Sequence, residues 1–398
     1  MQFFYFRNLG YKLSNMKNIN LTYVTTYDGQ DIHALSGTNY FIAKALEKQN
    51  VNVEYVGNLA FKMSWMARCR RKFHLKYAQD GFLADRDVSV AKNYAKEIQS
   101  RISPNTNVIF SPSTIPIALL PKQNGVKKVF YTDATFGSMI DYNSNFFNLG
   151  KYAIKQGNRL EKKALESCDL AIFASDWAAE NAINDYNVDP KKVKVVPRGA
   201  GFDTLRTKSE VEQLVLTKST NECNLLFVGK NWEWKGGDIA LGTAKILHKK
   251  GQKVHLDIVG VNKCPVELPD YVTNHGFISK STEEGIKKME TLFSQAHFFI
   301  LPTRSECMGI SFCEASSFGL PSLATNTGGV STAVRDGVNG KLFELSDSSE
   351  KYAEYIEKTL MDFESYKKLC FTSFEEYENC LNWEVAGKTI VKLIEEIL

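Results

Sequence analysis

The chain has 398 residues, which is too long for one ordinary hydrophobic core and predicts two domains. With 43% hydrophobic and 24% charged residues it has the composition of a soluble globular protein, which argues against a disordered or membrane-spanning class. The net charge of +4 is mild for this length and does not favour nucleic acid binding, which needs a concentrated basic face. Eight scattered cysteines without a CxxC pair fit a reducing cytosol, and the six histidines lack metal-ligand spacing.

The first residues, 1–15, are rich in aromatic side chains. They lack the basic region, the long apolar region and the small-residue cleavage site of a signal peptide. No stretch of the chain reaches the roughly 18 apolar residues needed to cross a bilayer. We therefore expect residues 1–15 to be an extension of unknown role, the fold to begin near Met16, and the protein to be cytoplasmic.

Short β-rich runs then alternate with helical patterns along the chain. Strands are expected at 19–27, 52–57, 107–111, 128–132, 170–175 and 193–197, and in a second series at 224–229, 253–260, 297–302, 321–325 and 341–343. Helices are expected at 38–50, 237–250, 283–295, 349–370 and, as one amphipathic helix, 382–398. Near-continuous apolar strands that alternate with helices indicate parallel sheets covered on both faces, so each series predicts one doubly wound domain.

The expected organisation is an α/β protein with two Rossmann-like domains, at 16–200 and 201–380. A C-terminal helix at 381–398 is expected to pack back toward the N-terminal domain. Residues 198–222 are polar and short of apolar periodicity, so we expect the linker there. Because ligands of doubly wound folds bind beyond the carboxyl ends of the strands, the site is expected in a central cleft that the two domains face.

Two glutamates, Glu306 and Glu314, stand around Gly309, shortly after the strand pattern at 297–302. The next helix is expected to begin near Ile310, so Glu306 lies in the preceding loop and Glu314 in the early helical turns. An open helix N-terminus suits a phosphate, glycine lets the backbone come close, and a carboxylate accepts hydrogen bonds from a vicinal diol. A phosphate with a diol on each side describes a nucleotide sugar.

This segment resembles the retaining glycosyltransferases of family 4, the glycosyl transferases group 1, which have the GT-B fold. The resemblance rests on the E-x7-E spacing, on "LLFVGKNWEWKGGDIAL" (225–241) and on "GLPSLATNTGGVSTAVRDGVNGKLF" (319–343), and it covers most of the chain from about Asn20. It implies that Glu306 contacts hydroxyls of the donor hexose and that Glu314 holds the ribose. Taken alone, either glutamate is an ordinary solvated charge.

Two lysines, Lys230 and Lys235, follow the strand pattern at 224–229 and precede a helix expected from Gly237. Lysines at a strand end are usually solvated, but the resemblance implies that this pair neutralises the donor diphosphate. No metal or other cofactor is then required, because two ammonium groups and a helix end balance the charge. The one DxD pattern, at 85–87, lies in a charged helix-like stretch, and we discount it as a metal site.

Further donor contacts are implied by the resemblance. They lie at the helix start near Ile310 and in two segments distant from it in the sequence. These residues are Gly37, Thr38, Arg198, Met308, Gly309 and Ile310. For Gly37 and Thr38 a simple βα turn with Thr38 as the helix cap is an equal alternative. Arg198 stands where the family commonly has asparagine, and it serves either the hinge or an anionic substrate group.

Asp133 follows the strand pattern at 128–132, where the family often has a His-Asp pair. Thr132 stands in the place of the histidine. The resemblance implies a catalytic role for Asp133, which would orient or deprotonate the acceptor hydroxyl. A capping or loop aspartate is an equal alternative.

A basic stretch, 62–76, carries six lysines and arginines and no acidic residue, with aromatic side chains among them. It indicates a peripheral contact with an anionic membrane at its inner face, or a solvated segment without a partner. No nucleic acid partner is expected.

The predicted activity is the retaining transfer of a hexose-type sugar from a nucleotide diphosphate sugar to a hydroxyl of a glycan or lipid-linked acceptor. UDP is favoured as the nucleotide and GDP is next. We find no second carboxylate arranged as a nucleophile, and the family implies a same-face displacement. The alternatives are a UDP-sugar epimerase of the same fold, a glycogen or starch synthase, and a non-catalytic nucleotide- or glycan-binding protein.

Overall fold

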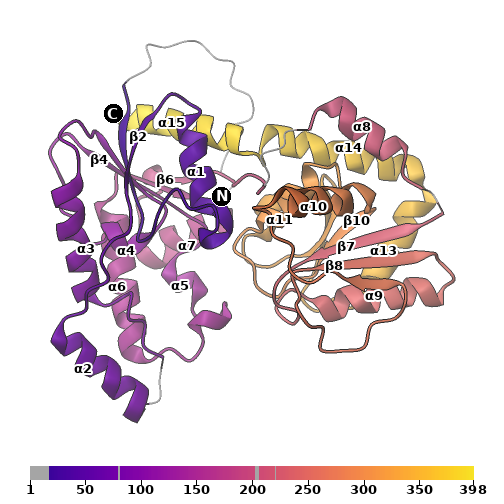
Figure 1. Cartoon of the computed structure of the whole chain (residues 1–398), viewed down its shortest axis with the longest axis horizontal. Helices are drawn as coiled ribbons and strands as arrows, with labels where there is room; N and C mark the ends of the chain where they lie inside the picture. The colour runs from indigo at the N-terminus through magenta and orange to yellow at the C-terminus, as the bar shows by residue number, and fades with distance from the viewer. Residues whose placement is uncertain (1–17, 79–80, 202–205, 220) are drawn as a thin grey trace. The chain divides into compact units, whose positions relative to one another are not determined.

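A computed structural model describes residues 18–78, 81–201, 206–219 and 221–398. The expected extension at 1–15 lies outside these residues. The chain divides into two compact units, Met1–Val196 with Ala386–Leu398, and Pro197–Val385. Each unit is built on a six-stranded parallel sheet with helices packed around it (Figure 1), which confirms the predicted α/β class.

The first unit has the strand order β2-β1-β3-β4-β5-β6. Its strands are β1 Asn20–Val24, β2 Asn52–Val56, β3 Val108–Ser111, β4 Lys127–Thr132, β5 Leu170–Phe173 and β6 Val193–Val195. The interior strands β3 and β5 are buried along their whole length, as expected for strands covered by helices on both faces.

The helices of this unit connect the strands and cover the sheet. They are α1 Thr38–Glu47, α2 Trp65–Phe73, α3 Val88–Arg101, α4 Thr114–Ile117, α5 Phe136–Met139, α6 Lys151–Ser167 and α7 Asp176–Tyr186, with short helices η1 Ala34–Gly37, η2 His74–Ala78, η3 Ser144–Phe146 and η4 Pro190–Lys192. The last helix, α15 Trp383–Ile397, joins them from its fourth residue onward. Gly387 lies so close to α1 that a Cβ there would be 2.4 Å from the carbonyl oxygen of Ala45.

The second unit has the strand order β12-β11-β10-β7-β8-β9. Its strands are β7 Cys223–Val228, β8 Val254–Val259, β9 Val272–Asn274, β10 Phe298–Leu301, β11 Ser322–Thr325 and β12 Gly340–Phe343. Its helices are α8 Lys208–Leu216, α9 Gly237–Lys249, α10 Glu283–Gln295, α11 Ile310–Ser316, α12 Val330–Ala333, α13 Ser349–Met361 and α14 Phe363–Asn379. The order reverses between β7 and β10, and the carboxyl ends of these two strands form the switch point at which doubly wound folds bind ligands.

Two expectations about elements are wrong. The polar stretch 198–222 contains the helix α8, which buries Val211 and Val215 and begins with a capping box between Thr207 and Glu210. The single helix expected at 349–370 is two helices, because the chain turns at Asp362, whose side chain accepts a hydrogen bond from the first turn of α14.

Candidate functional site

The loops that follow β7 and β10 are fastened to each other at the switch point. The backbone N–H of Arg304 donates to the carbonyl of Trp234 at 2.8 Å, and the hydroxyl of Thr303 donates to the same carbonyl at 3.2 Å. The guanidinium of Arg304 makes a two-pronged ion pair with Asp238 in the first turn of α9, at 2.9 and 2.7 Å. Because bidentate pairs fix both partners, the two loops form one surface.

Lys235 and Glu306 meet on this surface. The Lys235 ammonium lies 2.6 Å from Oε2 of Glu306 and 3.3 Å from the carbonyl oxygen of Ser305, and both side chains are partly exposed. The approach depends on Gly236, which caps α9 with a φ of 73° and has no room for a Cβ, since the carbonyl oxygen of Pro302 would lie 2.0 Å away. The chain therefore holds a cation and a carboxylate side by side at the carboxyl ends of adjacent strands.

Helix α11 begins at Ile310, as the sequence predicts, and Gly309 sets its direction. The φ of Gly309 is 87°, and a Cβ there would lie 2.6 Å from the ring of Phe312 and 3.2 Å from Cγ of Glu306. Any side chain at this position would both strain the backbone and push Glu306 away. Met308 is buried under the turn.

Glu314, in the second turn of α11, is almost fully buried at 1% exposure. Both of its carboxylate oxygens contact the ammonium of Lys280, at 2.5 and 2.6 Å. The backbone of Gly201 lies so close that a Cβ would be 2.6 Å from Oε1. Sequence reasoning missed Lys280, because it missed the short strand β9, and recognition of that strand would have put Lys280 in a loop at a carboxyl end.

Lys230 is exposed on the loop after β7, with its ammonium 5.5 Å from the centre of the Phe277 ring. Phe277 itself is 61% exposed, which is unusual for a large aromatic side chain. Lys230 and Phe277 thus form an exposed cation–aromatic pair in the same unit as Lys235 and Glu306.

Arg198 belongs to the second unit, and its backbone is bound to the segment around α11. Its N–H donates to the sulfur of Met308 at 3.3 Å, and its carbonyl accepts a hydrogen bond from the thiol of Cys313 at 3.3 Å. These contacts fix the start of the second unit, and the expected contact of Arg198 with substrate stays a prediction.

The remaining predicted site residues lie in the first unit. Gly37 caps α1 with a φ of 76°, and Thr38 is the first helical residue, so the alternative in which Thr38 itself caps the helix is wrong. Asp133 follows β4 and is partly buried. Their proposed roles toward donor and acceptor stay predictions.

The acidic pattern at 85–87 has a structural task. Asp87 is the N-cap of α3, accepts a hydrogen bond from the backbone of Ser89 at 2.8 Å and pairs with Arg70. Burial alone would raise the pKa of Asp87, but the hydrogen bonds from Ser89 and Arg70 hold it below its usual value. Within the described residues no cluster of three or more His, Cys, Asp or Glu side chains is arranged to hold a metal ion.

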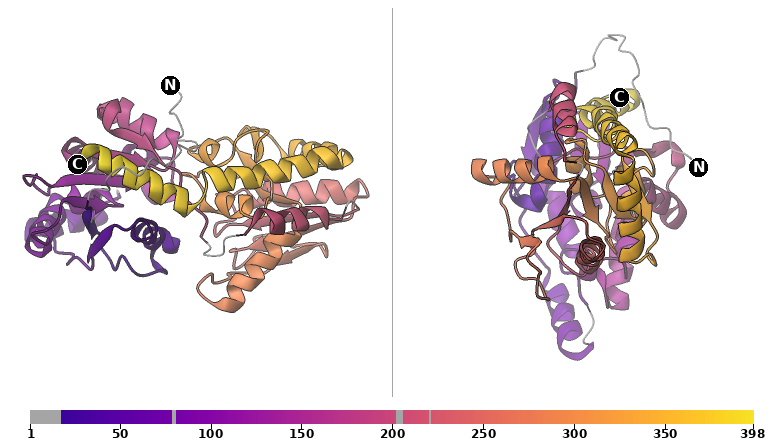
Figure 2. Two further views of the ribbon diagram at one scale, coloured as in Figure 1. Left: turned by 90° about the horizontal axis from the view of Figure 1, so that it is seen from above. Right: turned by 90° about the vertical axis from the view of Figure 1, so that its right-hand side faces the viewer.

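The basic stretch forms α2 and the following η2. It lies at the lower end of its unit, away from the strands, in Figure 1 and in the right-hand view of Figure 2. Trp65 is 77% exposed, and the neighbouring large apolar side chains are also exposed, namely Phe61, Met66, Phe73, Leu75 and Tyr77. Of the helices in the described part of the chain, none is long and apolar enough to pass through a bilayer.

The chain was compared with models of known protein families. The sequence model of the glycosyl transferases group 1 matches residues 222–362, a segment that contains Lys230, Lys235, Glu306 and Glu314. Within residues 222–362 the match confirms the resemblance to the glycosyl transferases group 1, and the assignment to family 4 and the retaining mechanism stay predictions.

Two related proteins carry the name D-inositol 3-phosphate glycosyltransferase. The protein from Mycobacterium sp. (strain JLS) is 26% identical over 214 residues, which are 50% of this chain and 46% of the relative. The protein from Mycobacterium tuberculosis (strain ATCC 25177 / H37Ra) is 28% identical over 195 residues, 46% of this chain and 39% of the relative. The matched region thus spans less than half the length of these relatives.

Solved structures resemble the chain over nearly its whole length. A glycosyltransferase from Rickettsia africae ESF-5 has a TM-score of 0.65 at 16% identity and covers 96% of this chain and 98% of its own. Anabaena Alr3699/HepE in complex with UDP and glucose has a TM-score of 0.61 at 15% identity, with 95% and 100% coverage. WaaG, a glycosyltransferase of lipopolysaccharide biosynthesis, has a TM-score of 0.60 at 13% identity, with 94% and 99% coverage. At these identities the likeness concerns the fold, and the chain has the GT-B fold.

Proposed function

We propose, from the premise that residues 222–362 form a domain of the glycosyl transferases group 1, that this chain is a retaining glycosyltransferase. It transfers a hexose-type sugar from a nucleotide diphosphate sugar to a hydroxyl of a glycan or lipid-linked acceptor. One observation carries the proposal: Lys235 and Glu306 are in contact at 2.6 Å beyond the carboxyl ends of β7 and β10. A cation for a phosphate and a carboxylate for sugar hydroxyls are there side by side, as a sugar diphosphate requires.

The donor is proposed to lie along the switch point of the second unit. Its diphosphate takes the ammonium groups of Lys230 and Lys235, and the backbone at Met308, Gly309 and Ile310 approaches the phosphates where α11 begins. Lys235 has three N–H donors, so it can keep its contact with Glu306 and still donate to a phosphate oxygen.

Two carboxylates are proposed to recognise the two sugar rings of the donor. Glu306 accepts hydrogen bonds from hexose hydroxyls, and Glu314 from the ribose diol. A carboxylate has about four acceptor positions, so the bond of Glu314 to Lys280 leaves acceptor positions unused that the two ribose hydroxyls are proposed to take.

In the proposed reaction the bond between the anomeric carbon and the phosphate oxygen breaks. The acceptor oxygen forms the new bond to the anomeric carbon on the same face, and its proton passes to the leaving phosphate oxygen. Glu306 and the lysines stabilise the charge that develops on the sugar and the diphosphate, and Asp133 orients the acceptor hydroxyl. Gly37, Thr38 and Arg198 are proposed as further donor contacts.

The proposed donor is a UDP-sugar, with a GDP-sugar as the second choice. It is supported by the family match and by the structural likeness to Anabaena HepE, which was solved in complex with UDP and glucose. We further propose that the reaction needs no metal ion, because Lys230 and Lys235 supply two positive charges to the diphosphate.

A peripheral contact with the inner face of an anionic membrane is proposed through residues 62–76. Six of the eleven exposed large hydrophobic side chains among the described residues fall within 61–77, where the charged residues are all basic. This combination suits a surface of lipid headgroups over a first layer of acyl chains.

Donor binding is tested with a panel of nucleotide diphosphate sugars in a thermal unfolding assay, with EDTA in parallel. A bound donor at 100 times its Kd should add about 2.7 kcal/mol of stability. Transfer is then measured with the radiolabelled donor that stabilises most, and NMR of the product gives the anomeric configuration. Inversion at the anomeric carbon, or transfer abolished by EDTA and restored by a divalent cation, would contradict the proposal.

A further inference from the structure

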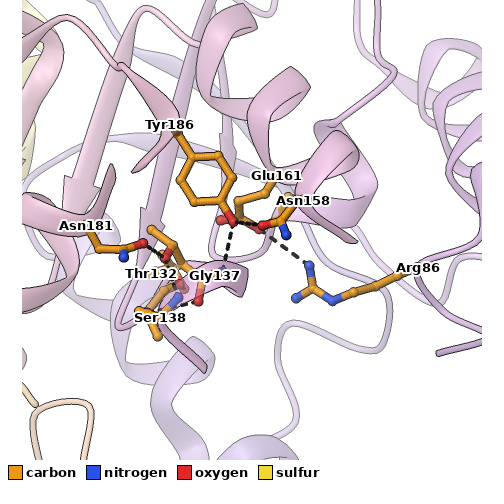
Figure 3. Close-up of polar contacts among 11 residues, drawn as sticks. Arg86, Thr132, Gly137, Ser138, Asn158, Glu161, Asn181 and Tyr186 are labelled. Atoms are coloured by element: carbon orange, nitrogen blue, oxygen red, sulfur yellow. Dashed lines mark hydrogen bonds and ion pairs between the residues drawn. The ribbon is translucent and has the colours of Figure 1, made fainter. Parts of the chain in front are cut away.

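The turn that carries Asp133 is held at both of its ends. On one side Thr132 ends β4, pairs with Phe173 in the sheet, and accepts a hydrogen bond from the N–H of Ala174 at 2.8 Å. On the other side Gly137 is bound by a side chain of α7. Asp133 and Ala134 therefore lie between two fixed points, and the second of these is built from side chains of α6 and α7 (Figure 3).

Tyr186, the last residue of α7, forms the second fixed point. Its hydroxyl accepts a hydrogen bond from the N–H of Gly137 at 2.8 Å and donates to Oδ1 of Asn158, on α6, at 2.5 Å. Gly137 fits tightly, since a Cβ would lie 2.9 Å from the Tyr186 oxygen. The phenol thus links the turn to two helices with one donated and one accepted bond.

Phe136, next to Gly137, is tightly packed. Its ring lies against Gly157 of α6, where an added Cβ would be 2.2 Å from ring atoms. On the ring also lies the guanidinium of Arg86, 4.4 Å from the ring centre. Arg86 in turn pairs with the buried Glu161 at 3.4 Å. These contacts prevent the turn from shifting along the sheet edge.

The surroundings of Tyr186 also favour the protonated form of its phenol. Burial and the nearby Glu161 carboxylate both raise the pKa of the Tyr186 phenol above its usual value. Burial likewise raises the pKa of Glu161, against the lowering effect of Arg86 and of a 2.9 Å hydrogen bond from Thr114. At neutral pH the phenol is therefore protonated, and it can donate to Asn158 while it accepts from Gly137.

We propose that Tyr186 is a positioning residue of the transfer reaction, which fixes Asp133 through the hydrogen bond to Gly137, with Asn158 orienting the phenol. This inference rests on the proposed function, in which Asp133 orients the acceptor hydroxyl. A side chain placed within a few tenths of an ångström matters for rate because reacting groups need near-ideal geometry. Tyr186 itself need not touch either substrate.

The test is a double-mutant cycle in the full chain, with sugar transfer as the readout. Tyr186→Phe keeps the ring and removes the hydroxyl, and should lower kcat about tenfold with the KM for the donor unchanged. In the Asp133→Asn background the same change should have no further effect, because the residue that Tyr186 positions is already disabled. Asn158→Leu is the second variant and should lower kcat in the same way.

Tyr366→Phe is the matched control. It removes a buried tyrosine hydroxyl that donates to the carbonyl of His297 at 2.9 Å in the other unit, and it should leave kcat unchanged. Two outcomes overturn this inference and leave the proposed function standing. One is that Tyr186→Phe lowers kcat by the same factor in the wild-type and Asp133→Asn backgrounds. The other is that Tyr186→Phe leaves kcat unchanged while Asp133→Asn lowers it. A wild-type protein that transfers no sugar, or an Asp133→Asn variant with full activity, instead overturns the proposed function.

Discussion

Glu306 is the single side chain on which the proposed chemistry depends most. Glu306→Gln keeps the shape and removes the charge, so it should lower kcat about 100-fold while the donor Kd changes little, because the carboxylate acts mainly on the charge of the transition state. Single-turnover transfer and calorimetric donor titration measure the two quantities. Glu364→Gln is the control, because Glu364 is an exposed glutamate that pairs with Lys367. A lost donor affinity at unchanged turnover would contradict the assignment.

The ion pair of Lys280 with Glu314 leads to a second prediction about single residues, which concerns the free energy of unfolding. Lys280→Met leaves the buried Glu314 carboxylate without its ion pair and should cost about 1–3 kcal/mol, less than for a fully buried pair because Lys280 is partly exposed. Lys287→Met breaks an ion pair with Glu283 that is exposed on both sides and should cost less than about 0.5 kcal/mol. Urea unfolding compares them, and equal costs would refute the role of the pair. Adding Glu314→Gln to Lys280→Met should restore part of the loss.

At the scale of elements, His297 joins the start of β10 to β7. Its Nδ1 accepts a hydrogen bond from the backbone N–H of Asn224 at 3.0 Å. Its Nε2–H donates a hydrogen bond to the carbonyl oxygen of Ser219 at 2.9 Å. Burial, with the charge of nearby Lys218, lowers the pKa of His297 to about 4 from the ordinary 6.5. The ring is therefore neutral in the fold, and a proton on Nδ1 would break the bond to β7.

The sign of the pH effect follows from this lowered pKa. The unfolded chain binds the proton near pH 6.5 and the folded chain only near pH 4, so the stabilising contribution is complete above 6.5 and is lost as the pH falls toward 4. The loss amounts to at most about 3 kcal/mol. Urea unfolding between pH 7 and 4 should show it, and His297→Gln should flatten the curve. His248→Gln, at an exposed position, is the matched control, and a slope in His297→Gln as steep as that of the wild type would contradict the assignment.

The elements themselves were predictable where local physics decides them. Apolar runs such as 297–302 and 224–229 gave β10 and β7, and the expected helix starts at Gly237 and near Ile310 are confirmed. Each of these starts follows a glycine whose tight backbone approach only glycine allows. The three-residue strand β9 was missed because so short a run carries too little periodicity to be seen. Its loop holds Phe277 and Lys280, so that part of the site was missed with it.

At the scale of the whole molecule, the number of sheets and the fold class followed from the two series of strands. The partners of individual side chains did not. Lys235 with Glu306 and Tyr186 with Gly137 are 71 and 49 positions apart, and no local pattern encodes such pairs. They follow from strand order, which parallel crossovers set and which a list of strands leaves open.

The last prediction concerns the surface of α2, because a membrane contact there would bring the whole protein to a lipid surface. Ala67 is the buried contact of this helix, whereas Trp65 and Phe73 are mostly exposed in a segment whose charged residues are all basic. Moving exposed aromatic side chains from water into a lipid interface lowers the free energy. The basic side chains in addition attract anionic headgroups within a Debye length.

We expect the protein to co-sediment with vesicles that contain phosphatidylserine at low salt, and much less in 1 M salt or with neutral vesicles. The double variant Trp65→Ser with Phe73→Ser should lose most of the binding and keep its affinity for a soluble donor. Leu345→Ser with Met361→Ser removes two exposed apolar side chains of the other unit and should bind as the wild type does. Because electrostatics brings the helix to the surface and the aromatic rings retain it there, binding that salt does not weaken, or that survives loss of both rings, would contradict a contact through this segment.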